Sequence, residues 1–156
     1  MRNSILVEEK INELGYELKE APKPLASYIP VTTVGNLVFT AGQVPVSSGN
    51  LLYKGKLGKD LSDDEGKKAA ELCAVNCLNV IKSEIGDLDK VDKIVKVTVF
   101  VNSADGYTDQ PKIANGASDF LVNVFGEKGK HVRSAVGVNE LPINAPVEVE
   151  MIVAVK

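Results

Sequence analysis

The chain has 156 residues, of which 44% are hydrophobic and 25% are charged, with a formal net charge of −3. This length suits a single domain over residues 1–156 with a substantial core. The composition excludes a disordered chain, and no apolar run approaches the roughly 20 residues of a membrane span. The acidic balance, without any dense run of Lys or Arg, argues against binding of nucleic acid through its phosphates.

The N-terminal residues are the first predicted element. Apolar positions at helical spacing predict a helix over residues 4–14 that ends at Gly15. Acidic residues at this spacing replace the apolar block of a signal peptide, so we expect a cytoplasmic protein. A connection punctuated by prolines follows this helix.

The next predicted element is a β-hairpin. Residues 26–46 are rich in strand-forming residues, and Gly35-Asn36 between two apolar runs indicates the hairpin turn. Residues 47–61, which are rich in Gly and Lys, are interpreted as a loop that contains at most a short edge strand.

The clearest helix begins with a capping box, Ser62 followed three residues later by Glu65, and ends at Gly86. We expect Cys73 and Cys77 to be packing residues on its buried face, because neither CxxC spacing nor a neighbouring charge indicates a redox pair. The other members of this predicted buried stripe are Ala69, Leu72, Val80, Ile81 and Ile85.

Strands and one more helix complete the chain. A strand, a helix that has Pro111 in its first turn, and two strands are predicted over residues 91–101, 108–126, 131–141 and 145–155. Helices grouped on one face of a sheet are the economical packing for this order. The sequence therefore predicts an α+β two-layer sandwich, with a mixed β-sheet and two main helices on one face.

The strand sequence HVRSAVGV raises a chemical question, because Arg133 is the only arginine beyond the second residue. Side chains alternate along a strand, so Arg133 shares a face with Ala135 and Gly137, which leaves a hollow beside the guanidinium. A planar guanidinium in a hollow suits bidentate binding of a carboxylate or a phosphate. The simpler alternative is a salt bridge to Glu148 or Glu150 on a neighbouring strand.

Other chemistries find little support in the residue types present. With one histidine and no Cys/His cluster we expect no metal site, and the chain has no glycine-rich phosphate-binding motif. His131 and Ser134 fall on opposite faces of their predicted strand, so we do not expect a Ser-His nucleophile.

Three blocks of the sequence, LVFTAGQVPV, KIVKVTVFVN and RSAVGVNELPINAPVEVEMIVAV, resemble the RidA/YjgF family of reactive-intermediate deaminases. The resemblance covers about residues 24–156. Residues 1–23, an N-terminal helical extension, and much of the 47–61 loop lie outside it, which indicates a longer branch of the family. It implies a chorismate-mutase-like fold and a homotrimer with sites in the clefts between subunits.

The resemblance also implies a reaction. Active members hydrolyse enamine and imine forms of 2-amino acids, such as 2-aminoacrylate, to 2-oxo acids and ammonia without a metal or a cofactor. Arg133 matches the residue that binds the substrate carboxylate, and Glu148 matches the carboxylate that positions the attacking water. An anionic Glu148 near Arg133 should stay ionised at neutral pH. The implied substrate-binding positions are Tyr28, Ala41, Asn115 and Ala135.

Two of these positions depart from the family pattern. Ala41 stands where many members have Ser, and Ala135 stands where some have Cys, although a role of the backbone survives both changes. Two other functions stay open: a non-enzymatic module that binds small carboxylates, and a ribonuclease, which the acidic balance disfavours.

The sequence also favours a homo-oligomer independently of the resemblance. In the last strand, residues 147, 149, 151, 153 and 155 form an apolar face that a single helix layer need not cover. A second copy of the chain would then cover it.

Overall fold

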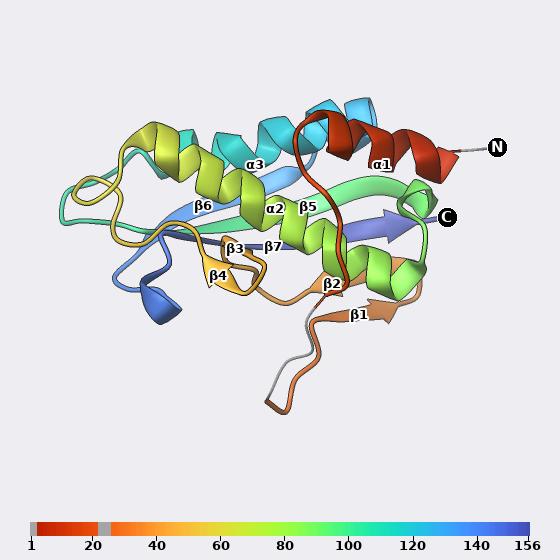
Figure 1. The fold of residues 1–156 in the computed structure, drawn as a ribbon, viewed down its shortest axis with the longest axis horizontal. Coiled ribbons are helices and arrows are strands. Elements are labelled where there is room, and N and C mark those ends of the chain that lie inside the picture. The colour runs from red at the N-terminus through yellow and green to blue at the C-terminus, as the bar shows by residue number, and fades with distance from the viewer. Residues whose placement is uncertain (1–2, 22–25) are drawn as a thin grey trace.

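The computed structural model describes residues 3–21 and 26–156. A five-stranded sheet carries the long helices on one of its faces, which confirms the predicted α+β two-layer arrangement (Figure 1). No helix in these two described ranges is long and apolar enough to cross a membrane.

The first half of the chain follows the sequence prediction closely. Helix α1, Asn3–Glu13, ends before Gly15, whose positive φ of 95° suits a residue without a Cβ. The predicted hairpin turns at Gly35-Asn36. The segment interpreted as a loop contains one small two-stranded sheet. The strands of this half are β1 (Val31–Val34), β2 (Leu37–Thr40), β3 (Val46–Ser47) and β4 (Asn50–Leu51).

The second half contains the two long helices and three longer strands. In the capping box of α2, Asp63–Ile85, the Glu65 amide donates to the Ser62 hydroxyl and the Ser62 amide donates to the Glu65 carboxylate. The other elements are the short helix η1 (Leu88–Lys90), β5 (Val91–Asn102), α3 (Gln110–Phe125), η2 (Gly126–Gly129), β6 (Val132–Val138), η3 (Pro142–Asn144) and β7 (Val147–Val155).

The strand order of the main sheet is β1-β2-β7-β5-β6. Only the pair β5 and β6 is parallel, because α3 forms the crossover between them, and the other pairs are antiparallel. The sheet is therefore mixed, as predicted. The last strand, β7, lies in its centre.

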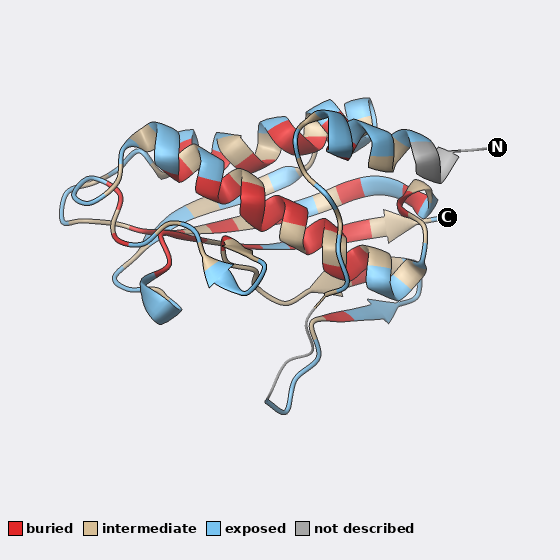
Figure 2. Cartoon of the chain, viewed as in Figure 1, coloured by how far each residue is buried: buried red, intermediate tan, exposed pale blue. Residues whose placement is uncertain are grey.

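The core lies between the sheet and the two long helices. Figure 2 shows that buried residues concentrate along α2 and the central strands. Both cysteines are buried, and their thiols contact the carbonyl oxygens of Val147 and Val149 at 3.5 and 3.4 Å. Burial raises the pKa of the Cys77 thiol to about 12, which confirms a packing role. The predicted stripe of α2 is buried except for Ile85, which is half-buried.

The apolar face of β7 does not support the oligomer argument drawn from the sequence. Val147, Val149 and Val153 are fully buried in the single chain, because α2 packs over this face of the strand. Among the described residues no helix covers the opposite face of the sheet (Figure 1), and there Val132 and Val136 of β6 are 65% and 45% exposed. The expectation that the apolar face of β7 is left uncovered was therefore wrong.

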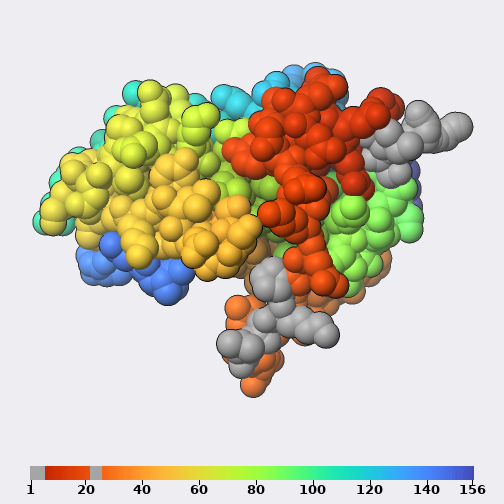
Figure 3. All heavy atoms as spheres, viewed as in Figure 1, coloured from red at the N-terminus to blue at the C-terminus, as the bar shows by residue number. Residues whose placement is uncertain are grey.

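The segment after α1 crosses the outer surface of α2, as Figure 3 shows in red and orange. The backbone amide of Lys19 donates to Asn79 Oδ1 at 2.9 Å, and its ammonium group donates to Ser48 Oγ at 3.2 Å. Tyr16 packs edge-on against Phe120, with ring centroids 5.7 Å apart. The N-terminal extension is therefore tied to both long helices.

Candidate active site

Arg133 lies on the helix-facing side of β6, directly beside α3. Its Nη1 atom donates to Asn115 Oδ1 at 2.8 Å and to Ser118 Oγ at 3.1 Å. Its Nη2 atom has only a long contact, 3.4 Å, with the carbonyl oxygen of Pro111. The structure thus brings Asn115, which the sequence singled out, into direct contact with Arg133.

No Asp or Glu in the described ranges forms an ion pair with Arg133, so the simple salt-bridge interpretation does not apply. The Arg133 side chain is half-buried. Its Nε–H group donates no hydrogen bond to the residues that the structure describes, so the edge of the guanidinium that carries Nε is open. An arginine held in place but not neutralised is suited to binding an external anion.

The hollow that the sequence predicted beside Arg133 is partly filled. Ala135 follows on the same face and is half-buried, but the space above Gly137 holds the Gln110 side chain. A Cβ at position 137 would lie 2.6 Å from Gln110 Nε2 and 3.0 Å from Ser103 Oγ. The open space is therefore confined to the part of β6 nearer to Arg133.

Glu148 lies on the other face of the sheet, against a bulge that follows β2. Phe39 pairs with Ile152, and Gln43 pairs with Val149. The chain therefore advances four residues after Phe39 while β7 advances only three, which leaves one extra residue on the first strand. Ala41 and Gly42 form this bulge. A Cβ at Gly42 would lie 2.0 Å from Glu148 Oε2, so the carboxylate occupies the place of a missing side chain.

The Glu148 carboxylate has no hydrogen-bond or ion-pair partner among the residues that the structure describes. Burial, and then the charge of Glu150, raise its pKa above the ordinary value of 4.5. Within one chain Arg133 does not lie beside this carboxyl group, so the expectation that Arg133 keeps it ionised stays a prediction for a site between two copies. A half-buried carboxylate without a partner is suited to accepting a proton from a bound water molecule.

Arg133 and Glu148 do not meet within one chain. Strand β5 lies between β6 and β7, so the two residues are not on neighbouring strands as the sequence interpretation assumed. Arg133 pairs with Val97, which faces the helices, whereas Glu148 pairs with Phe100, which faces the open side. Alternation along β5 therefore places the two groups on opposite faces of the sheet.

The remaining predicted positions divide between these two regions. Ala135 lies on the same face of β6 as Arg133. Ala41 lies in the bulge against which Glu148 packs. Tyr28 is 59% exposed, and within the described residues no hydrogen bond joins it to Arg133 or Glu148. Sequence reasoning missed Ser118 and Gly42, since a helix residue and a bulge cannot be located without the register of the sheet.

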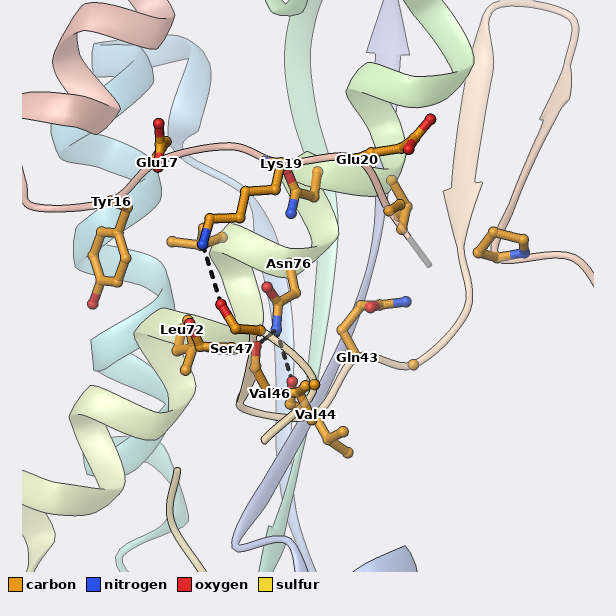
Figure 4. A pocket seen from close by; sticks show the side chains of 18 of the residues that line it. Tyr16, Glu17, Lys19, Glu20, Gln43, Val44, Val46, Ser47, Leu72 and Asn76 are labelled. Carbon is orange, nitrogen blue, oxygen red and sulfur yellow. Dashed lines mark hydrogen bonds between the residues drawn. The ribbon is translucent and has the colours of Figure 1, made fainter. Parts of the chain in front are cut away.

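A cavity of about 670 Å³ lies elsewhere, between the 15–21 segment, the 42–49 loop and α2. Figure 4 shows Lys19 reaching across it toward the loop and Asn76 donating to the carbonyl oxygen of Val44. Of the predicted site residues only Tyr28 lines it. It contains neither reactive group, so we do not assign the chemistry to it.

Metal-binding residues do not cluster in the structure. Within residues 3–21 and 26–156, no group of three or more His, Cys, Asp or Glu is arranged to hold a metal ion.

Comparison with known proteins identifies the fold and the family. Residues 8–154 match the model of the family described as YjgF/chorismate mutase-like, putative endoribonuclease. The chain belongs to the YjgF/RidA family. The YjgF/RidA match begins inside α1, so it reaches further toward the N-terminus than the sequence resemblance did.

Three proteins are similar to the chain over most of their own length. A crystal structure of Atu1372 from Agrobacterium tumefaciens, of unknown function, is 40% identical with a TM-score of 0.93, covering 98% of this chain and 94% of that one. Protein TCP17 of Trypanosoma cruzi is 40% identical over 94% of this chain and 92% of its own length. The 2-iminobutanoate/2-iminopropanoate deaminase of Dermatophagoides farinae is 31% identical over 87% and 91%.

Proposed function

We propose that the protein hydrolyses small 2-imino acids, formed from enamines such as 2-aminoacrylate, to 2-oxo acids and ammonia. The observation that carries this proposal is Arg133, an anchored guanidinium without a carboxylate partner among the described residues. A charge-assisted hydrogen bond between such a group and a substrate carboxylate contributes about 1.5 to 3 kcal/mol. The similar protein of Dermatophagoides farinae, which is named a deaminase, supports the same reaction class.

The proposed reaction divides its work between two groups. Arg133 binds the carboxylate and holds the imine carbon in place. Glu148 accepts a proton from the water molecule that attacks this carbon and gives it to the imine nitrogen, which forms a carbinolamine. It then transfers the hydroxyl proton of the carbinolamine to the same nitrogen, as the C=O bond forms, the C–N bond breaks and ammonia leaves. The iminium carbon is already electrophilic, so orientation of the two reactants supplies much of the acceleration.

Because Arg133 and Glu148 lie on opposite faces of one sheet, the proposal requires two copies of the chain at each site. We therefore propose a homotrimer with three sites between subunits, as the resemblance implies. The exposed side chain of Tyr28 is free to contribute to a neighbouring copy.

The proposal is tested by forming 2-aminoacrylate in situ and measuring the release of pyruvate. The protein should accelerate the release, and Arg133→Ala should remove the acceleration while Lys130→Ala, an exposed neighbour, retains it. No acceleration by the wild type, or equal acceleration by Arg133→Ala, would exclude the proposed reaction.

The same preparation distinguishes the two other functions. A binding module would gain thermal stability with 2-oxobutanoate but would release no pyruvate. A ribonuclease would cleave RNA with an activity that Arg133→Ala or Glu148→Gln changes and that copurifies with the protein. Either result without imine turnover would replace the deaminase proposal.

A further inference from the structure

The guanidinium of Arg133 is attached to a chain of hydrogen bonds that ends at the backbone of η2. The carbonyl oxygen of Gly129 lies 2.6 Å from Nδ1 of His131, and Nε2 of the same ring lies 2.9 Å from Ser118 Oγ. Ser118 Oγ in turn accepts a hydrogen bond from Arg133 Nη1 at 3.1 Å. The only histidine of the chain thus acts on Arg133 through one serine.

The direction of each hydrogen bond follows from its ends. A carbonyl oxygen only accepts, so Nδ1 of His131 carries the hydrogen and Nε2 of the neutral ring is an acceptor. Ser118 therefore donates its hydroxyl hydrogen to Nε2, which turns its lone pairs toward Arg133. Burial lowers the pKa of His131; the Gly129 hydrogen bond opposes this effect and the charge of Arg133 adds to it.

This arrangement uses both hydrogens of Nη1. One is donated to Asn115 Oδ1 at 2.8 Å and the other to Ser118 Oγ. The edge formed by Nε–H and Nη2–H is left, where two parallel donors match the two oxygens of a carboxylate. The contacts with α3 therefore determine which edge of the guanidinium faces a ligand.

We propose that Ser118 and His131 are positioning residues, which fix the Arg133 guanidinium so that its Nε and Nη2 edge binds the carboxylate of the substrate. This inference rests on the proposed function, in which Arg133 is the carboxylate-binding residue. It adds two residues that the family resemblance does not assign.

Electrostatic coupling gives the proposal a distinct signature. In the free protein the positive charge of Arg133 lowers the pKa of His131. A bound carboxylate neutralises this charge. Binding should therefore raise the pKa of His131. The other charged residues on the surrounding elements are Lys112 and Asp119 of α3, Asp92, Lys93 and Lys96 of β5, and Glu127, Lys128 and Lys130 of η2 and its cap, where Glu127 pairs with Lys130 at 2.9 Å.

Calorimetric binding of 2-oxobutanoate tests the role of Ser118. Loss of one hydrogen bond to the guanidinium should weaken binding by Ser118→Ala about threefold to tenfold. Ser118→Thr, which keeps the hydroxyl group, should bind within about twofold of the wild type. Ser83→Ala, an exposed serine of α2, is the matched control. Binding by Ser118→Ala that equals the wild type would overturn the proposal.

The single histidine allows an independent measurement by NMR. The pKa of His131 should lie below 6.5 in the free protein and should rise when 2-oxobutanoate saturates it. Arg133→Ala should show no ligand-dependent rise. A wild-type protein that binds the ligand without any change in the pKa of His131 would contradict the coupling.

The two proposals fail in different ways. If Arg133→Ala binds 2-oxobutanoate as tightly as the wild type, the carboxylate-binding role of Arg133 is wrong. If Arg133→Ala loses binding but the Ser118 variants do not differ, only the positioning role is wrong.

Discussion

At the scale of single residues, Glu148 combines partial burial with the lack of any hydrogen-bond or ion-pair partner among the described residues. Burial raises its pKa, which means that the folded chain disfavours the ionised form. A group of this kind costs stability at neutral pH, and a functional role explains why such a group is present.

Glu148→Gln should reduce imine turnover by about 100-fold or more, because it removes the group that accepts a proton from water. Glu150→Gln, on the same face of β7 but exposed, is the control and should retain turnover. Similar losses in both variants would indicate a general effect of charge and would contradict a specific role of Glu148.

The same variant has an expected signature in stability. A carboxyl group whose pKa is raised by folding stabilises the folded state fully below its ordinary value of 4.5, and it loses this contribution as the pH rises through the folded value. Gln does not titrate, so in an Arg133→Ala background, where no guanidinium of a neighbouring copy can lie beside the carboxyl group, Glu148→Gln should gain stability between about pH 4 and about pH 7.5. Urea denaturation at both values measures the difference, and a relative loss would contradict the raised pKa.

At the scale of elements, two glycines show equally close contacts with different consequences. A Cβ at Gly116 of α3 would lie 2.0 Å from the backbone carbonyl oxygen of Lys67 in α2, so the two helices would have to separate. A Cβ at Gly42 would lie equally close, 2.0 Å, to the Glu148 carboxylate, which can rotate away.

Gly116→Ala should therefore lower the free energy of unfolding by about 2 to 3 kcal/mol, because a backbone atom cannot change its rotamer. Gly42→Ala should change stability by less than about 1 kcal/mol but should reduce turnover, since the carboxylate is displaced. Chemical denaturation and the pyruvate assay on both variants check the two outcomes. The assignment of the two contacts would be wrong if Gly42→Ala were the less stable variant.

The positions of individual helices and strands were predicted more successfully than their arrangement in space. The capping box located α2, alternating β-branched residues located β5 and β7, and Gly35-Asn36 located the hairpin. The sequence could not reveal that β5 separates β6 from β7, because strand order depends on contacts between distant residues. For this reason the structure does not place Arg133 and Glu148 on neighbouring strands of one chain. Asn115, which contacts Arg133, was singled out through the family resemblance, which supplied information that the residue pattern lacks.

At the scale of the whole molecule, the open face of the sheet carries exposed Val132 and Val136. Sheet faces with apolar side chains are commonly covered by another layer, and within the described chain no helix performs this role here. In the proposed homotrimer a second copy of the chain would cover this face and would bring a Glu148 to each Arg133.

Mixing two inactive variants tests the shared site. Arg133→Ala and Glu148→Gln chains, unfolded and refolded together in equal amounts, should regain turnover at about a quarter of the sites, because each site then draws one intact residue from each parent. Light scattering should give three chains per particle. A mixture no more active than its separately refolded components would exclude a site shared between copies.

The central place of β7 affects how the protein is made. Strands β2 and β5 each form hydrogen bonds with β7, so both keep an unpaired edge until residues 147–155 leave the ribosome. From the synthesis of β5 until that of β7, the nascent chain thus holds two unfinished strand edges and the side of α2 that β7 will cover. Chaperone binding to the growing polypeptide would protect these surfaces until the final strand closes the sheet.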